Sequence, residues 1–262
     1  MGRRSAGAGG ARGPGGGAMI KMTICAGRRP GMTHGEFRRY VTTVHGPLVA
    51  SISEVAADLH AYHYNFPVAG ASDPLLGHPL ADTLDIVTQG WFDSVAAQRA
   101  NMRHPRYLQV IRPDEGRFAD EARAVMHYMI ERRLGEFPSP AAPAPAKLLY
   151  FRRRRSGLTR PAFQEAWLGE AGPALAAAAA GSLGYQQNHA VAESEHPDGG
   201  DTKYYDVIDE IALASPAAAA ALGADRTASD RLRDIESRLL EPGRTRVLIT
   251  ETVVSLPWKD RR

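Results

Sequence analysis

A short stretch near the N-terminus, GMTHGEFRRYVTTVHGPLVA at 31–50, occurs twice in this chain. It aligns without a gap to GLTRPAFQEAWLGEAGPALA at 157–176, and a pair of arginines lies just before each copy. Two later segments align in the same order: HAYHYNF at 60–66 with LGYQQNH at 183–189, and DIVTQGWFDS at 85–94 with DVIDEIALAS at 206–215. The sequence therefore contains an internal duplication, so both copies are predicted to share one fold.

Each copy predicts the same order of strands and helices. In the first copy a helix opens at Thr33, because Thr33 and Glu36 form a capping box. The pattern around it predicts strands at 20–27, 60–66, 83–91 and 123–131 and a second helix at 95–104. The second copy predicts strands at 147–154, 184–190, 204–213 and 246–254, with helices opening at Thr159 and at 217–222. This order is βαββαβ, the ferredoxin-like pattern.

Such a sheet carries both of its helices on one face and leaves the other face bare. In a duplicated chain the sheet of the other copy can cover that face. We therefore expect an α+β fold in which two sheets pack face to face, with a functional cavity between them.

The composition predicts four segments. Residues 1–18 are rich in glycine and arginine without an apolar run, which indicates a disordered tail rather than a signal peptide, and Met19 is a second candidate start. Residues 19–134 and 147–258 are the two predicted domains. The alternating prolines within 135–146 predict an extended linker between them.

The overall composition is that of a soluble globular protein, with 44% hydrophobic and 23% charged residues in a chain of 262. The single cysteine, Cys25, excludes an internal disulfide and favours a cytoplasmic location. No apolar run reaches the roughly 20 residues of a membrane helix. The net charge of +3 is matched by the arginines of the tail, so we expect neither a membrane nor a nucleic acid partner.

These motifs together resemble the EthD family of the dimeric α/β-barrel superfamily. The resemblance rests on RRPGMTHGEFRRYVTTVHGPLV, on Tyr-x-x-Asn in YHYN and YQQN, on the Gln-Asn-His of the second copy, on DIVTQGWFDS and on DEGRFAD at 114–120. It implies two tandem ferredoxin-like domains that form an intrachain dimeric α/β barrel. It also implies a small-molecule enzyme or accessory protein, a group that includes dehydratases, cyclases and isomerases of polyketide or aromatic metabolism.

His45 is the first candidate catalytic residue. Gly46 and Pro47 follow it and disfavour a continuous helix, so we expect a kink that turns the ring towards a cavity. A histidine titrates near neutral pH and can act as a general base. The alternative is that His45 only caps the carbonyl groups of the preceding helix.

The two copies differ at this point, since Ala171 aligns with His45 and Ala212 with Trp91. We expect one complete site, supplied mainly by the first copy.

Tyr62 is the second candidate catalytic residue, because its hydroxyl can hold a carbonyl or an enolate oxygen. Tyr62 and Tyr64 lie on one face of their strand and His63 and Asn65 on the other, and the sequence leaves open which face lines the cavity. The candidate substrate-binding residues are Tyr64, Trp91, Tyr185, Asn188 and His189. Packing in the core is the alternative for each of them.

Asp114 and Asp120 are interpreted as caps of a short turn, with the orientation of His45 as the alternative. No metal site is expected, since no His-x-x-x-His pair is present. We expect no cofactor, with haem on a single histidine as a minor possibility.

The sequence favours a cofactor-independent lyase or cyclase for a small aromatic or polyketide substrate. A cofactor-free or haem-assisted monooxygenase and a non-catalytic hydrophobic-ligand-binding protein are the alternatives. The predicted assembly is an intrachain pseudo-dimer, and a homodimer stays open.

Overall fold

Eight strands close into one barrel in the computed structural model, which describes residues 19–194 and 204–259. The predicted disordered tail at 1–18 lies outside the described residues. The strands are β1 (Ile20–Ala26), β2 (Ala61–Pro67), β3 (Ile86–Phe92), β4 (Val125–Arg133), β5 (Ala146–Arg152), β6 (Gly184–Ala190), β7 (Val207–Leu213) and β8 (Arg246–Leu256). Around the barrel their order is β1-β3-β2-β8-β5-β7-β6-β4, and every neighbouring pair is antiparallel.

The two halves of the barrel have the same strand order. The first half runs β4-β1-β3-β2 and the second runs β8-β5-β7-β6. The expected mixed fold with a barrel is therefore found. The two sheets are not separate layers, however, because β2 pairs with β8 and β4 pairs with β6. Closure in this way leaves neither sheet with an unpaired edge.

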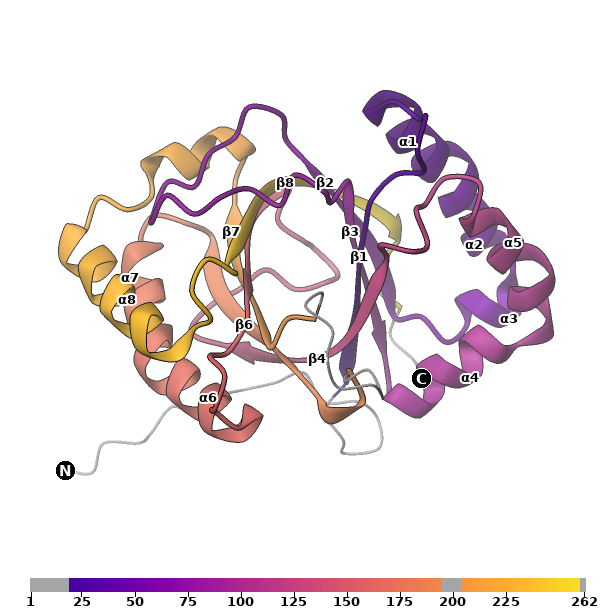
Figure 1. Ribbon diagram of the computed structural model, residues 1–262. Helices are drawn as coiled ribbons and strands as arrows, with labels where there is room; N and C mark the ends of the chain where they lie inside the picture. Colours follow the sequence, from indigo (N-terminus) through magenta and orange to yellow (C-terminus); the bar gives the residue numbers. More distant parts are fainter. Residues whose placement is uncertain (1–18, 195–203, 260–262) are drawn as a thin grey trace.

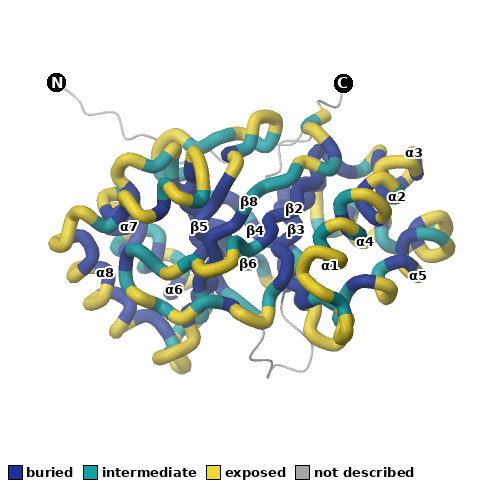
Figure 2. Tube along the Cα trace, turned by 90° about the horizontal axis from the view of Figure 1, so that it is seen from above, coloured by how far each residue is buried: buried dark blue, intermediate teal, exposed yellow. Residues whose placement is uncertain are grey.

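Helices cover the barrel on two opposite sides (Figure 1). The first half carries α1 (His34–Tyr40), the π-helical turn η1 (Val41–His45), α2 (Gly46–Ser51), α3 (Ser53–Ala56), α4 (Val95–Arg103), the π-helical turn η2 (Tyr107–Ile111) and α5 (Arg112–Glu115). The second half carries α6 (Arg160–Ala166), the π-helical turn η3 (Trp167–Ala171), α7 (Gly172–Ala178), the short 3-10 helices η4 (Ala192–Ser194) and η5 (Pro216–Ala221), and α8 (Arg226–Leu239). Seen from above, the buried strands lie between two helical layers whose outer sides are exposed (Figure 2).

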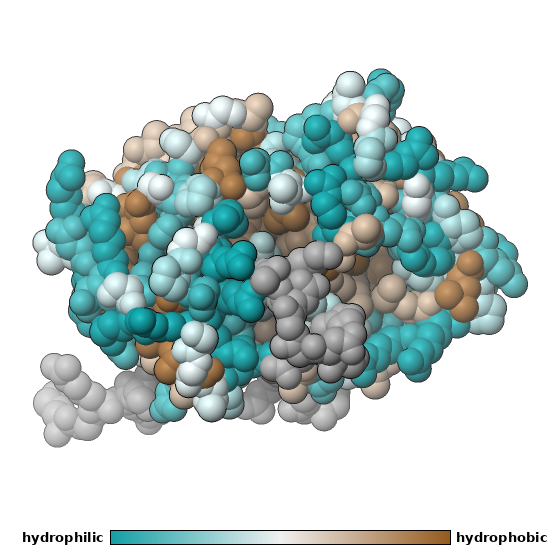
Figure 3. Space-filling view, viewed as in Figure 1, coloured by the Kyte–Doolittle hydropathy of each residue, from teal (hydrophilic) through white to brown (hydrophobic). Residues whose placement is uncertain are grey.

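Hydrophilic side chains cover most of the face seen in Figure 3, and the hydrophobic residues on it form small separate groups. Within residues 19–194 and 204–259, no helix is both long and apolar enough to cross a membrane.

The start of the first helix is confirmed as predicted. Thr33 accepts a hydrogen bond from the backbone of Glu36, and the Glu36 carboxylate accepts one from the backbone of Thr33. The main helix of the second half was predicted in the wrong place, because 217–222 forms mostly a 3-10 helix. The longer helix α8 begins after Asp225, whose side chain accepts a hydrogen bond from the backbone of Ala228.

Each strand presents one face to the helices and the other to the barrel interior. Met22 on β1 packs with Phe37 and Val41 beneath the helices of the first half. Lys21 and Thr23, on the opposite face of the same strand, are buried inside the barrel. Tyr62 and Tyr64 belong to the helical side, where they join the same apolar cluster.

The barrel interior contains a buried ion-pair network. Lys21 Nζ lies 2.6 Å from Glu131 Oε1 and 3.1 Å from Glu210 Oε1. Lys147 Nζ lies 3.4 Å from the other oxygen of Glu210. Asn188 accepts a hydrogen bond from Lys21 at 2.8 Å. These side chains leave a pocket of about 10 Å³ beside Lys21, Trp91 and Lys147, much smaller than the cavity that we expected between the two sheets.

The charges of this network depend on one another. Burial alone would raise the pKa of Glu210, but the ammonium groups of Lys147 and Lys21 outweigh that effect and lower it to about 2. The folded carboxyl thus binds its proton less readily than the unfolded one. It contributes stability above its ordinary pKa of 4.5, and this contribution is lost as the pH falls towards 2.

We expect Glu210→Gln to lower the free energy of unfolding by about 3–5 kcal/mol at pH 7, because it leaves two buried ammonium groups with one carboxylate. The difference from wild type should shrink when urea unfolding is measured at pH 3. An equal difference at both pH values would contradict this account of the network.

Candidate functional site

The candidate site is a cavity of about 340 Å³ outside the barrel, between the sheet of the first half and its helices. Its walls are mainly apolar: Ile24, Ala26, Val41, Ile86, Met102, Phe118, Ala119, Ala124, Val125 and Met126. His45, Tyr62, Tyr64 and Thr88 add polar groups to the wall. A mainly apolar pocket with a few convergent polar groups is typical of a site for a small organic molecule.

A widened helical turn brings His45 to this cavity. The helix that starts at Thr33 continues through the π-helical turn η1, whose last residue is His45, and Gly46 N–H donates to Val41 O. Pro47 has no N–H for the regular ladder, which accounts for the wider turn at this point. The helix widens at His45 but does not break into the kink that we expected. The backbone angles at His45 and Gly46 are helical, and α2 follows directly.

Gly46 is required by close packing at this turn. A Cβ atom there would lie 2.9 Å from Ser255 Oγ and 3.2 Å from Val41 O. The Gly-Pro pair after His45 therefore seats the helix tightly against the strands.

A chain of hydrogen bonds holds the His45 ring. Its Nδ1 lies 3.0 Å from Asp114 Oδ2, and Tyr40 donates its hydroxyl to Asp114 Oδ1 at 2.6 Å. His45 and Asp114 are both buried, and the ring packs on Phe118 with 4.6 Å between centroids. An ionised carboxylate only accepts hydrogen bonds, so it selects the tautomer with a proton on Nδ1. Nε2 is then the ring nitrogen that can accept a proton from a molecule in the cavity.

Two tyrosine hydroxyls share the wall with His45. Burial raises the pKa of Tyr62 well above its ordinary value, and burial likewise raises the pKa of Tyr64. Their rings pack edge to face, with centroids 5.2 Å apart. Both hydroxyls therefore stay protonated near neutral pH and can donate hydrogen bonds to an oxygen of a bound molecule.

Charged side chains surround another part of the cavity. Arg112 donates to Glu121 through both terminal nitrogens at 2.9 Å and to Glu115 at 2.8 Å. Tyr107 donates its hydroxyl to the other oxygen of Glu115. Arg112 has an exposed side chain, so this group of paired charges borders solvent.

The same place in the second half is filled. Trp167 occupies the position of Val41, and Tyr150 and Arg152 occupy those of Ile24 and Ala26. All three side chains are fully buried. Arg152 Nε donates to Asp209 at 3.1 Å, and its guanidinium group also pairs with Glu236. Larger side chains and buried ion pairs thus replace the cavity that the first half leaves open.

The structure brings together only part of the predicted site. His45, Tyr62 and Tyr64 line one cavity. Trp91 and Asn188 face the barrel interior, where Trp91 donates to Glu131 at 3.1 Å. Side chains alternate between the two faces of a strand, and Trp91 in β3 and Asn188 in β6 both lie on the face opposite to the helices. Neither therefore reaches His45.

Tyr185 and His189 also lie away from His45. Tyr185 is on the helical side of the second half and donates to Asp209 at 2.7 Å. His189 lines a different pocket and is buried, with its Nε2 2.7 Å from Gln187 Oε1. Because the cavity lies within one half, residues of the second half do not reach it.

Sequence reasoning missed several groups at this site. Tyr40 was not among the predicted site residues and Asp114 was interpreted as a turn cap, yet Asp114 holds His45 and Tyr40 holds Asp114. Asp120 does act locally, since it pairs with Arg123 at 2.6 Å. The alternative interpretation, in which Asp114 orients His45, agrees with the structure. The two residues are far apart in sequence, so the sequence gave no means to choose it.

In residues 19–194 and 204–259, no three His, Cys, Asp or Glu side chains converge on a point where a metal ion could bind.

Known proteins resemble this chain in sequence and in fold. The EthD domain family model matches residues 29–122. The conidial pigment biosynthesis dehydratase EthD of Metarhizium robertsii is 31% identical over 116 residues, covering 41% of this chain and 79% of the relative. Dehydratase ustZ of Ustilaginoidea virens is 29% identical over 115 residues, covering 41% of this chain and 80% of that protein.

Solved structures extend the likeness to the whole barrel. A putative monooxygenase from Fusobacterium nucleatum aligns with a TM-score of 0.54 at 5% identity, over 93% of this chain and 97% of that one. An anthrone oxidase-like protein aligns with a TM-score of 0.51 at 13% identity, over 90% and 93%. At such low identity this likeness shows the fold alone.

Most of the residues that line the His45 cavity, including His45, Tyr62 and Tyr64, lie within the stretch that the family model matches. Because the chain is 31% identical to the Metarhizium robertsii dehydratase over 79% of that protein and matches the EthD domain model, it belongs to the EthD family.

Proposed function

We propose that this protein is a dehydratase that removes water from a small carbonyl compound, with His45 as the proton acceptor. The observation that carries the proposal is the pairing of His45 with buried Asp114 at the wall of a mainly apolar cavity. The names of the two relatives, both dehydratases, support the same type of reaction.

The proposed reaction needs one base and one oxygen-binding group. His45 Nε2 takes the proton from the carbon next to the carbonyl group, and Asp114 stabilises the imidazolium that forms. The hydroxyl of Tyr62 or Tyr64 donates a hydrogen bond to the enolate oxygen. The C–O bond of the β-hydroxyl group then breaks, the imidazolium returns its proton to the departing oxygen, and water leaves. His45 ends neutral, and a carbon–carbon double bond has formed.

The walls of the cavity favour a flat, mainly apolar substrate such as an aromatic or polyketide intermediate. The charges near Arg112 are paired with Glu115 and Glu121, so the cavity has no strong preference for an ionic substrate. This chemistry draws only on groups of the chain, and we propose that it needs no cofactor.

We further propose that the chain is a tandem of two EthD-like units, 19–134 and 147–258, of which the first is active. The repeated strand order of the two halves supports the tandem arrangement. The buried Trp167 and Arg152 in the second half support the restriction of activity to the first.

His45→Gln should lower kcat by a factor of about 10²–10⁴, because it removes the general base and preserves the size of the side chain. The assay follows loss of one water from an aromatic β-hydroxy ketone by mass spectrometry. Binding of the substrate, measured by fluorescence, should change little.

The matched control is His34→Gln, which changes a half-exposed histidine that is not in the cavity wall. If wild type binds the ketones and converts none of them, the protein is a binding module and the dehydratase proposal is wrong. Equal turnover by wild type and His45→Gln would also contradict it.

Tyr40→Phe and Asp114→Asn should lower kcat and leave KM nearly unchanged, because these residues position His45 without lining the cavity. In Asp114→Asn we expect kcat to fall on the order of a hundred-fold or more, because the amide no longer fixes the proton of His45 on Nδ1. In Tyr40→Phe, loss of one charge-assisted hydrogen bond to Asp114 should lower kcat about ten-fold. A rise in KM with constant kcat would assign both residues to packing instead.

Trp167→Ala in the filled half should lower the free energy of unfolding by about 3–5 kcal/mol, since it empties a packed core position. Tyr62→Phe at the open cavity should change it by less than about 1 kcal/mol. Urea unfolding of both variants measures the contrast. Similar losses would mean that the first-half cavity is packed as tightly as the second.

A further inference from the structure

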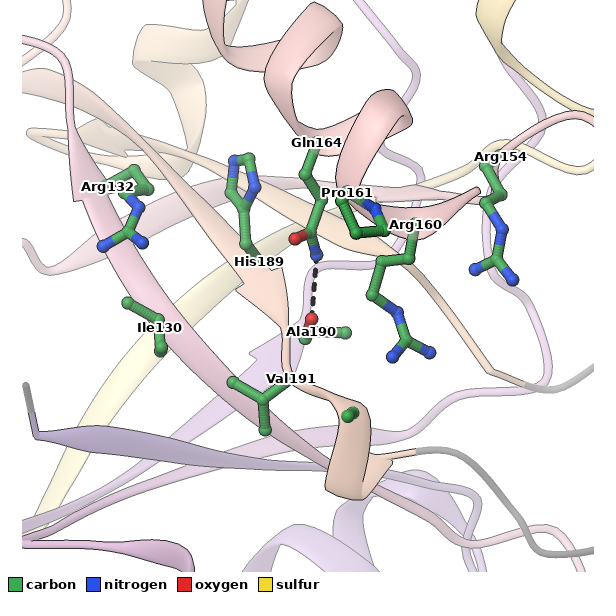
Figure 4. Close-up of a pocket in the computed structure, with 10 residues that line it drawn as sticks. Ile130, Arg132, Arg154, Arg160, Pro161, Gln164, His189, Ala190 and Val191 are labelled. Carbon is green, nitrogen blue, oxygen red and sulfur yellow. Dashed lines mark hydrogen bonds between the residues drawn. The ribbon is translucent and has the colours of Figure 1, made fainter. Parts of the chain in front are cut away.

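A second pocket, of about 430 Å³, lies at the seam where β4 pairs with β6, beside α6. Three arginines line it: Arg132 from β4, Arg154 after β5 and Arg160 at the start of α6. Figure 4 shows Arg132 on one side of the pocket and Arg154 and Arg160 on the other. Apolar contacts are available from Ile130, Pro161, Val191 and Ala192.

The wall of this pocket carries more positive than negative charge. Asp206 forms an ion pair with Arg154 and lies 3.8 Å from Arg160 Nε. Arg132 has neither an ion pair nor a side-chain hydrogen bond with any residue in the described parts of the chain. Asp206 therefore offsets part of the charge of Arg154 and Arg160, whereas Arg132 has no such partner among the described residues.

Two neutral side chains, His189 and Gln164, add no negative charge that would offset the arginines. Burial, together with the charge of Arg132, lowers the pKa of His189 to about 3, so this ring stays neutral at physiological pH. Gln164 donates its amide to Ala190 O at 2.8 Å, as Figure 4 shows. Its position beside the arginines leaves the side-chain carbonyl oxygen for other partners.

At the opposite seam, between β2 and β8, larger side chains cover the equivalent place. There Arg38 pairs with Glu251 at 2.7 Å, and its guanidinium group lies over the ring of Phe66 at 5.0 Å. At the β4–β6 seam, Gln164 stands in the position of Arg38, Ile130 in that of Glu251, and His189 in that of Phe66. The pocket thus lies where Gln164, Ile130 and His189 replace the salt bridge and the aromatic contact of the opposite seam, and three arginines line it.

We propose that the seam pocket binds a small molecule through a carboxylate or phosphate group held by Arg132, with Arg154 and Arg160 beside it. Arginine binds both oxyanions in the same forked geometry, and the apolar wall suits the rest of such a molecule. This site lies on the β4–β6 seam, away from the His45 cavity, and does not depend on the dehydratase proposal.

Calorimetric titration of the full chain with benzoate and, separately, with inorganic pyrophosphate tests the proposal and distinguishes the two anions. At least one of them should bind wild type in the millimolar range or tighter. Arg132→Gln should raise that Kd about ten-fold or more, as expected for loss of a charged hydrogen bond. The fold should be unaffected, since Arg132 has no described side-chain partner, and thermal unfolding checks this.

Two further variants separate this site from general charge attraction. Arg38→Gln removes the same charge at the closed seam and should leave binding unchanged. The double variant Ile130→Glu with Gln164→Arg introduces the pair that closes the opposite seam and should abolish binding at constant net charge. The proposal is wrong if neither anion binds wild type, if Arg132→Gln binds as wild type does, or if Arg38→Gln weakens binding equally.

Discussion

The pairing of β2 with β8 and of β4 with β6 determines where this protein can hold a small molecule. It closes the two sheets into a ring and leaves no gap between them for a ligand. The interior of so narrow a barrel is filled by its own side chains. Here charged side chains fill it, and the buried Lys21 and Lys147 balance Glu131 and Glu210. The His45 cavity and the seam pocket both lie on the outer face of the barrel, beside the helices.

The two halves use that outer face differently. In the first half, small side chains such as Ala26 and a helix drawn close at Gly46 leave space beside His45. In the second half, Trp167 and Arg152 occupy the equivalent volume. The difference comes mainly from a few side chains on a similar backbone, because three of the four equivalent strand pairs have equal lengths and the π-helical turns η1 and η3 align. Duplication thus allows one half to keep a cavity while the other contributes a rigid packed core.

The same contrast between an open and a filled position recurs at the two seams. Arg38, Glu251 and Phe66 close one seam, and the corresponding side chains leave the other open with Arg132 at its wall. Pockets at both places therefore follow from substitutions at equivalent positions. A pseudo-symmetric barrel offers each location twice, and side-chain volume decides which of the two is hollow.

The sequence by itself determined the strand pattern and the capping box at Thr33 and made His45 a candidate, since these depend on local periodicity and on spacing along the chain. It could not choose between the two faces of β2, because alternation assigns Tyr62 and His63 to opposite sides without saying which side is hollow. It also misplaced the helix at Arg226–Leu239, where alignment to the first copy outweighed the local signal of Asp225. Only the tertiary structure brought Tyr40 and Asp114 to His45, and only barrel closure put Trp91 and Asn188 out of its reach. Contacts between residues far apart in sequence depend on how side-chain volumes and charges fill the closed barrel, and no local pattern carries that information.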